Sequence, residues 1–225
     1  RMLLIPFGWL FELVVRLRSV MYKLGILPSV TLGCPVISVG NLTTGGTGKT
    51  PITLWLLGRA AAAGVRMGVL TRGYGGVNQE NDEVAMLRMR FPKAAVGVGA
   101  DRVASARGLN VISPIDTFLL DDGFQHFRIR RDLDLVLVDA TDPFGGGNCL
   151  PAGLLREPRT AIRRAGIVLM TRVDQVPREI ADGIWNELAA CGYSGPRVEA
   201  RHKASALVSI DPEGESISLS RLLGA

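Results

Sequence analysis

Residues 35–51 read PVISVGNLTTGGTGKTP, and this stretch determines the fold that the sequence predicts. A short apolar strand over 35–39 leads into a glycine-rich turn, and a helical segment over 52–63 follows. Glycines allow backbone N–H groups to converge on phosphate oxygens, and the positive end of the helix adds its field at the same point. This order of elements is typical of a phosphate-binding P-loop.

The polar residues of the turn have expected partners in a bound nucleotide. Lys49 would reach the β- and γ-phosphates, and the Thr50 hydroxyl would coordinate Mg²⁺. The first position of the usual G-x-x-x-x-G-K-[ST] pattern is Thr43 here, and the alternative is a glycine-rich turn that binds nothing. The predicted nucleotide-binding residues are Thr43, Thr44, Gly45, Gly46, Thr47, Gly48, Lys49 and Thr50.

Composition limits the classes of function. The 225 residues are 47% hydrophobic, enough to bury the core of one large domain, or of one domain and part of another. A net charge of +5 suits an anionic substrate or a membrane surface. The sequence lacks the dense basic stripe with interleaved aromatic residues that would indicate binding to nucleic acid. No protein partner is evident. The scattered cysteines lack metal-ligand spacing, which favours a reduced cytosolic compartment.

Strand-like and helix-like runs alternate through the middle of the chain. Such alternation implies βαβ units, and continuously apolar strands are typical of a parallel sheet buried on both faces. We predict an α/β, P-loop NTPase-like fold with a mostly parallel sheet flanked by helices. The further strands are expected over 65–71, 94–99, 117–122, 134–140 and 166–172, and the further helices over 82–91, 101–108 and 177–191.

The N-terminal segment 2–27 differs from the rest. Its first half is apolar nearly all round, but Pro6, Gly8 and Glu12 interrupt it and it is too short to span a bilayer. Basic and amphipathic aromatic residues follow, a combination typical of a helix that lies in a membrane interface. The alternative is an ordinary helix packed on the domain, with Glu12 and Arg16 paired.

A site that transfers or hydrolyses a phosphate also needs carboxylates near Mg²⁺, at the end of an apolar strand. Asp121 and Asp122 follow the apolar run 118–120 and fit this requirement. One aspartate would hold the metal while its neighbour orients or activates the attacking group. Without a P-loop upstream, the same residues would indicate only a strand that ends in a turn.

Three more segments are candidates for contact with a substrate. Residues 123–131 carry Gln125, His126 and several arginines, which would steer a phosphorylated substrate or form a solvated face. The loop 71–76 follows its own strand and should lie at the same ligand-binding edge of the sheet. The glycine-rich segment 145–158 is long, and long loops within compact domains are usually functional.

These motifs, in this order, resemble the tetraacyldisaccharide 4'-kinase family, the lipid A 4'-kinases of Gram-negative envelope synthesis. The matching motifs are VGNLTTGGTGKTP, LTRGYGG, LDDGFQH, RDLDLVLVDA and LPAGLLREP, spread over 35–158. The resemblance implies transfer of the ATP γ-phosphate, with Mg²⁺, to the 4'-hydroxyl of tetraacyldisaccharide 1-phosphate. It also implies a peripheral, monotopic enzyme on the cytoplasmic face of the bacterial inner membrane, with its N-terminal helix docked on the anionic surface.

The resemblance further implies roles for single residues. Asp82 would be the base that helps to deprotonate the sugar hydroxyl, although the family's Gly-Asp-Glu-Pro reads Asn81-Asp82-Glu83-Val84 here. Gln125 would contact the substrate, or the metal or its waters. The implied catalytic residues are Asp82, Asp121, Asp122 and Lys49; the metal ligands are Thr50, Asp122 and Glu157; the substrate contacts are Arg72, Tyr74, Gln125 and His126.

One element of the family pattern does not occur in these residues. The family pairs its aspartate base with a histidine in an Asp-His-His motif, and neither His126 nor His202 lies in such a motif. We therefore expect nucleotide binding to be retained and catalysis to be impaired. The expected units are a membrane-associated helix over 1–28, a P-loop kinase domain over 29–192 and the start of an incomplete C-terminal unit over 193–225.

Other classes of P-loop protein remain as alternatives. An ATPase switch with a K-G-G-x-G-K-[ST] loop would need a lysine where Thr44 stands. A GTP-binding switch would use 171–174, Thr-Arg-Val-Asp, as a guanine-reading [NT]-K-x-D motif with arginine in place of lysine. The third alternative is a protein that binds a nucleotide but has lost its catalytic activity.

Overall fold

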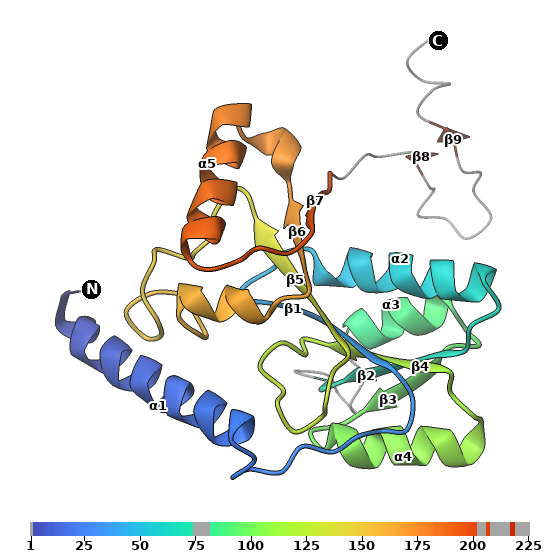
Figure 1. Ribbon diagram of the computed structural model, residues 1–225. Helices are drawn as coiled ribbons and strands as arrows, with labels where there is room; N and C mark the ends of the chain where they lie inside the picture. Colours follow the sequence, from blue (N-terminus) through green and yellow to red (C-terminus); the bar gives the residue numbers. More distant parts are fainter. Residues whose placement is uncertain (1, 74–81, 202–205, 208–216, 219–225) are drawn as a thin grey trace.

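A computed structural model of the chain describes residues 2–73, 82–201, 206–207 and 217–218 (Figure 1). The strands are β1 (Val36–Asn41), β2 (Met67–Thr71), β3 (Ala95–Val98), β4 (Thr117–Asp121), β5 (Leu133–Asp139), β6 (Ile167–Thr171) and β7 (Arg197–Glu199). They form one sheet in the order β3-β2-β4-β1-β5-β6-β7, and every pairing is parallel. A separate antiparallel pair joins β8 (Ala206–Leu207) and β9 (Ile217–Ser218).

Helices flank the sheet on both faces (Figure 1), so the predicted fold class is confirmed. Every predicted strand and helix is present, with small differences at the ends: the helix after the P-loop begins at Lys49 instead of residue 52. The α-helices are α1 (Ile5–Lys23), α2 (Lys49–Ala62), α3 (Asp82–Arg90), α4 (Arg102–Ile112) and α5 (Arg178–Ala190), and the 3₁₀ turns are η1 (Met2–Leu4), η3 (Arg159–Arg164) and η4 (Val173–Gln175).

Successive side chains of the central strands point to opposite faces of the sheet, and both faces are covered. Leu119 on β4 is buried in a cluster with α2 and α3, whereas Phe118 and Leu120 are buried in a cluster with α4. On β6, Val168 and Met170 are buried with residues of α5. A strand covered on both faces is apolar at most positions, which is why the interiors of these strands appear as apolar runs in the sequence.

The strand β7 was not predicted. It has three residues, all exposed, and it pairs with β6 at the edge of the sheet. An exposed edge strand needs no apolar run, so its sequence gives no strand signal. The sheet therefore contains residues on both sides of position 192, where a unit boundary is expected; the division into three units stays a prediction.

The topology brings the chemically interesting loops together. All strands of the main sheet run in the same direction, so the loops after β1, β2, β4, β5 and β6 all leave the sheet at its carboxyl edge. The register places Val39 opposite Asp121, and Asp139 opposite Thr171. Because β1 is the central strand, the P-loop lies in the middle of this edge.

The helix α1 touches the domain along a narrow strip. Gly8 is its only buried residue, and a Cβ added there would lie 3.1 Å from the Cβ of Ala152. Near the end of α1, the ring of Tyr22 stacks on Phe127 with 5.4 Å between ring centroids. Among the described residues, no helix is long and apolar enough to cross a membrane.

The close approach of Gly40 to Phe124 predicts a sharp effect on stability. A Cβ at Gly40 would lie 2.6 Å from the Cβ of Phe124, inside a fully buried part of the sheet. We expect Gly40→Ala to lower the free energy of unfolding by about 1–3 kcal/mol in urea denaturation. The matched control is Gly108→Ala on α4, where the added methyl meets no heavy atom within 4 Å and should stabilise the helix by about 0.5–1 kcal/mol. Equal effects of the two changes would contradict this packing.

Candidate functional site

The loop between β1 and α2 has the conformation that a phosphate cradle needs. Gly45 and Gly48 have positive φ angles of 124° and 86°, which glycine adopts most readily. A Cβ added at Gly45 or Gly46 would meet no heavy atom within 4 Å, so these glycines border open space. Gly48 is the N-cap of α2, whose positive end therefore faces the loop.

The segment 145–158 supports this loop from one side. The backbone N–H of Thr44 donates to the carbonyl of Leu154 over 2.8 Å, and the N–H of Arg156 donates to the carbonyl of Leu42 over 2.8 Å. Thr43 forms an isolated antiparallel bridge with Leu155. Segment 145–158, which the sequence predicted to be functional, thus holds the P-loop in place.

The end of β6 supports the P-loop from another side. The hydroxyl of Thr171 donates to the carbonyl of Thr47 over 3.1 Å, and the guanidinium of Arg172 donates to the carbonyl of Gly46 over 3.0 Å. Arg172 also forms an ion pair with Asp139, a buried residue at the end of β5.

A compact charge cluster lies beside the P-loop. The Nζ of Lys49 is 3.6 Å from Oδ1 of Asp122 and donates to Oδ1 of Asn41 over 3.3 Å. From segment 145–158, Nη1 of Arg156 binds Oδ2 of Asp122 over 2.6 Å. The structure therefore joins two predicted residues, Lys49 and Asp122, to two that the sequence analysis missed, Asn41 and Arg156. Asn41 and Arg156 lie within the motifs VGNLTTGGTGKTP and LPAGLLREP, but nothing in their spacing along the chain indicates contact with Lys49 and Asp122.

Asp122 is held in its charged form. Burial works to raise its pKa, but the positive charges of Lys49, Arg156 and Arg102 outweigh it and keep the pKa below its usual range. Its backbone has a φ of +48°, a left-handed conformation that is uncommon outside glycine and concentrates at functional sites. The carboxylate is thus fixed, charged and adjacent to the P-loop.

The neighbouring Asp121 has different surroundings. It is buried, and its Oδ2 accepts a hydrogen bond from the hydroxyl of Thr71 over 3.2 Å. Because Thr71 ends β2, this bond ties the ends of β2 and β4 together. The two adjacent carboxylates therefore occupy different positions, as separate roles in a site require.

Gln125 and His126 lie on the loop after β4. The amide of Gln125 donates to the carbonyl of Asn41 over 2.9 Å, which fixes this loop to the end of β1. The buried Nε2 of His126 has no hydrogen-bond partner among the described residues. Burial, followed by the positive charges of Arg102 and Arg131, lowers the pKa of His126 to about 4. The imidazole is neutral at pH 7.

Glu157 is engaged by another side chain. It is 1% exposed, and its carboxylate binds the guanidinium of Arg164 over 2.7 Å and 3.0 Å. Arg164 in turn lies over the ring of Phe124, 4.4 Å from its centroid. This pair anchors the end of segment 145–158, and the metal-binding role of Glu157 stays a prediction.

The remaining predicted residues lie around the same edge of the sheet or outside the described part. Thr50 is in the first turn of α2, and Arg72 directly follows β2. Asp82 begins α3, and Tyr74 lies outside the described residues. Their roles stay predictions.

Known proteins are similar to this chain over most of its length. The family described as "Tetraacyldisaccharide-1-P 4'-kinase", LpxK, matches residues 1–221. The chain belongs to this family. Among curated LpxK relatives, the tetraacyldisaccharide 4'-kinase of Anaeromyxobacter dehalogenans strain 2CP-1 is 40% identical over 88% of this chain and 56% of its own length. That of Syntrophotalea carbinolica is 39% identical over 98% of this chain and 64% of its own length.

A solved LpxK structure is also similar. The Aquifex aeolicus LpxK, determined in complex with ATP, matches with a TM-score of 0.69 and 26% identity over 94% of this chain and 85% of its own. The present chain spans between half and two thirds of the length of the two curated LpxK relatives. The resemblance stated from the motifs is confirmed.

The low pKa of His126 predicts a specific pH dependence of stability. Its pKa is about 4 in the folded protein, below the ordinary value of 6.5, so between these values the unfolded chain binds a proton that the folded chain does not. The free energy of unfolding should therefore fall as the pH is lowered from about 7 toward 4. We expect His126→Gln to remove this part of the loss, measured by urea denaturation along a pH series.

The control for this comparison is the range above pH 7, where the histidine is neutral in the folded and the unfolded state. There the difference in the free energy of unfolding between the parent and His126→Gln should not change with pH. Parallel stability curves for both proteins down to pH 4.5 would show that the folded histidine takes up its proton normally.

Proposed function

We propose that this chain binds Mg-ATP at the P-loop and takes part in transfer of the γ-phosphate to the 4'-hydroxyl of tetraacyldisaccharide 1-phosphate. The observation that carries the proposal is the Lys49–Asp122–Arg156 cluster beside an open glycine loop. Membership of the LpxK family supports the acceptor, and the ATP bound to the Aquifex aeolicus relative supports the donor.

The residues present fit a magnesium ion. The buried Oδ1 of Asp122 accepts no hydrogen bond among the described residues, although the Lys49 ammonium lies nearby, and the Thr50 hydroxyl is in the adjacent helical turn. No group of three or more His, Cys, Asp or Glu side chains that could hold a metal ion occurs within the described ranges. Mg²⁺ commonly uses one or two protein oxygens and completes its shell with water and substrate phosphates. When bound, the ion would neutralise phosphate charge.

The chain's own contribution is to position the phosphates and balance their charge. Lys49 and Arg156 hold the Asp122 carboxylate from two sides, and both can shift part of their charge to phosphate oxygens when nucleotide binds. Phosphoryl transfer asks for little covalent chemistry, so alignment and electrostatic stabilisation account for most of the rate. Asp121 and Asp82 are the proposed acidic residues nearest the acceptor hydroxyl, with Asp82 as base.

The acceptor would approach along the loops after β2 and β4. Arg72 follows β2, and Gln125 and His126 follow β4, at the same carboxyl edge as the P-loop. Tyr74 is two positions further along the chain than Arg72, outside the described residues. A neutral His126 can donate or accept a hydrogen bond without adding charge. We propose these four residues as contacts to the sugar or its phosphate.

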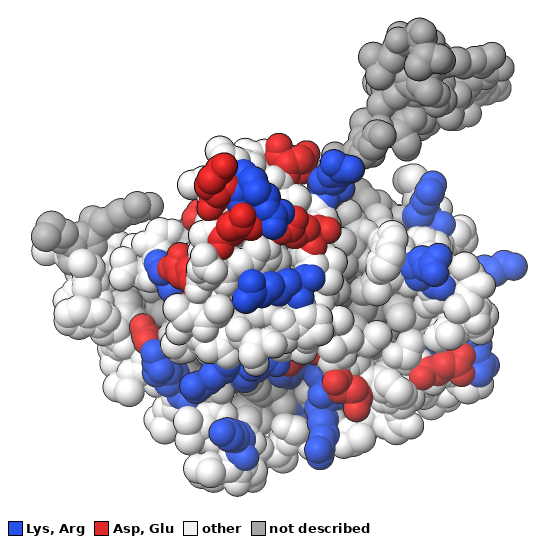
Figure 2. All heavy atoms as spheres, turned by 45° about the horizontal axis from the view of Figure 1, so that its top comes forward, with Lys and Arg blue, Asp and Glu red and all other residues white. Residues whose placement is uncertain are grey.

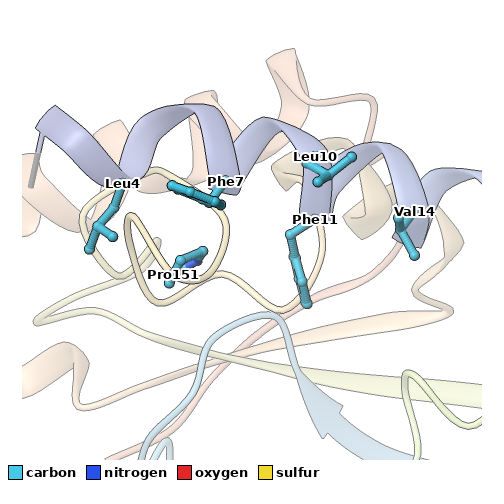
Figure 3. A pocket seen from close by; sticks show the side chains of 6 residues that line it. All are labelled: Leu4, Phe7, Leu10, Phe11, Val14 and Pro151. Carbon is cyan, nitrogen blue, oxygen red and sulfur yellow. The ribbon is translucent and has the colours of Figure 1, made fainter.

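The helix α1 is the proposed membrane contact. Figure 3 shows Leu4 of η1, apolar side chains of α1 and Pro151, which together line an open groove. The volume of this groove is about 510 Å³. Three leucines of α1 are mostly exposed: Leu10 at 59%, Leu13 at 62% and Leu17 at 59%. An apolar surface of this kind with basic residues beside it favours binding to an anionic interface. The cytoplasmic face of the bacterial inner membrane is the proposed location.

The transfer reaction is the first test. Labelled γ-phosphate should move from ATP to tetraacyldisaccharide 1-phosphate in mixed micelles, and Lys49→Ala should reduce the rate at least a hundredfold because a phosphate charge loses its partner. We expect a low rate in the parent chain, because the family's Asp-His-His motif does not occur in these 225 residues. The criterion is therefore dependence on Lys49. Absence of transfer by a chain that still binds Mg-ATP would contradict the kinase activity.

Membrane binding is tested separately. The double change Leu13→Ser and Leu17→Ser should reduce binding to anionic phospholipid vesicles by more than tenfold, because each buried leucine contributes about 1.5–3 kcal/mol. Co-sedimentation with the vesicles measures the bound fraction.

The control is the pair Val111→Ser and Ile112→Ser on α4, which are 88% and 82% exposed. This pair should leave vesicle binding unchanged, because it removes exposed apolar side chains from α4 and not from the proposed contact helix α1. Loss of binding in both double variants would contradict the assignment of the membrane contact to α1.

A further inference from the structure

The segment 171–174 at the end of β6 contacts the P-loop, and its Arg172 is engaged in contacts that leave it little freedom to recognise a nucleotide base. The segment 171–174 was one alternative as a guanine-reading motif. In the structure, Nη2 of Arg172 donates to the carbonyl of Gly46 over 3.0 Å, and Nη1 is paired with Asp139. The hydroxyl of Thr171 donates to the next carbonyl of the loop, that of Thr47, over 3.1 Å.

These two contacts fix the orientation of two peptide groups. In a planar trans peptide, the C=O and the following N–H point in opposite directions. A carbonyl of Gly46 that points at Arg172 therefore directs the N–H of Thr47 away from it. In the same way, the contact from Thr171 to the carbonyl of Thr47 directs the N–H of Gly48 to the opposite side. Convergent N–H groups are what a phosphate-binding loop supplies.

The arginine is itself held in place. Asp139 is 6% exposed, and its Oδ1 accepts hydrogen bonds from the N–H and the hydroxyl of Thr141 over 3.0 Å and 2.6 Å. Its other oxygen pairs with Arg172. The backbone of Arg172 has a φ of +57°, and among the described residues only Asp122 and Arg172 have positive φ without being glycine. A strained backbone beside an ion pair with a buried carboxylate is typical of a residue whose position is tightly specified.

We infer that Arg172, held by Asp139 and assisted by Thr171, is a positioning residue that orients the P-loop N–H groups of Thr47 and Gly48 toward the nucleotide phosphates. This role rests on the proposed binding of nucleotide at the loop. Arg172 acts through the loop backbone and need not touch the nucleotide. The same argument makes the phosphate chain, and not the base, the part of the ligand whose affinity depends on Arg172.

The test is the affinity of the full chain for Mg-ATP and for inorganic tripolyphosphate, each measured by competition with a fluorescent ATP analogue. Arg172→Ala should weaken both ligands about tenfold, because a hydrogen bond from a charged donor is lost. Thr171→Val should weaken both by about threefold, although it changes no charge. Arg172→Lys, which keeps one donor, should recover part of the loss.

The matched control is Arg178→Ala. Arg178 begins α5 and pairs with Asp182 of the same helix and with Glu199 of β7, in a region where Figure 2 shows acidic side chains gathered around basic ones. This variant should bind both ligands like the parent. In the transfer assay, Arg172→Ala should raise the KM for ATP and leave the KM for the lipid acceptor unchanged, a split that general loss of stability would not produce.

Several results would overturn the inference. Unchanged affinity for tripolyphosphate in Arg172→Ala would show that the loop is correctly oriented without it. A loss in Arg172→Ala with none in Thr171→Val would indicate a direct charge effect instead of positioning. If Arg172→Ala does not fold, the test rests on Arg172→Lys and Thr171→Val. Binding of both ligands by these two variants with the affinity of the parent would overturn the positioning role of Arg172. Failure of the parent chain to bind ATP would instead overturn the proposed function.

Discussion

The carboxylate of Asp122 is the charge on which the arrangement of the site depends. It is partly withdrawn from water, and Lys49 from α2 and Arg156 from the segment after β5 balance it. Removing either cation would leave this partly buried carboxylate with only one of its two partners, which weakens the balance of its charge. The three residues come from distant parts of the sequence, so this single electrostatic requirement fixes the P-loop, the end of β4 and segment 145–158 at one point.

The P-loop has scaffolding on two sides, and this follows from its chemistry. A loop that turns its N–H groups toward a ligand must turn carbonyls away from it, and buried carbonyls need donors. Segment 145–158 and the end of β6 supply backbone and side-chain contacts to 42–47. Segment 145–158 also bears the contact with Gly8 of α1. The proposed membrane helix and the nucleotide loop thus share one support.

The packing of α1 bears on both interpretations of the N-terminal segment, and its contact with a membrane stays a prediction. The Glu12–Arg16 pair exists, with a distance of 2.6 Å, and Gly8 packs on the domain as an ordinary helix would. The contact strip is narrow, however, and most apolar side chains of α1 remain exposed. The sequence showed that the first half of the segment is apolar nearly all round, but only the packing revealed which part of that surface the domain leaves uncovered.

The sequence by itself determined the elements whose signals are local. Unbroken apolar runs identified the buried strands, and the glycines before Lys49 identified the P-loop, because these features reflect the surroundings of consecutive residues. It also placed Asp121 and Asp122 at a strand end. Only the tertiary structure decided the partners: Arg156 on Asp122, Arg164 on Glu157 and Arg172 on the P-loop. An arginine carries the same charge and reach at any position in the sequence. Its partner is chosen by the strand order and by the way each loop closes over the carboxyl edge of the sheet.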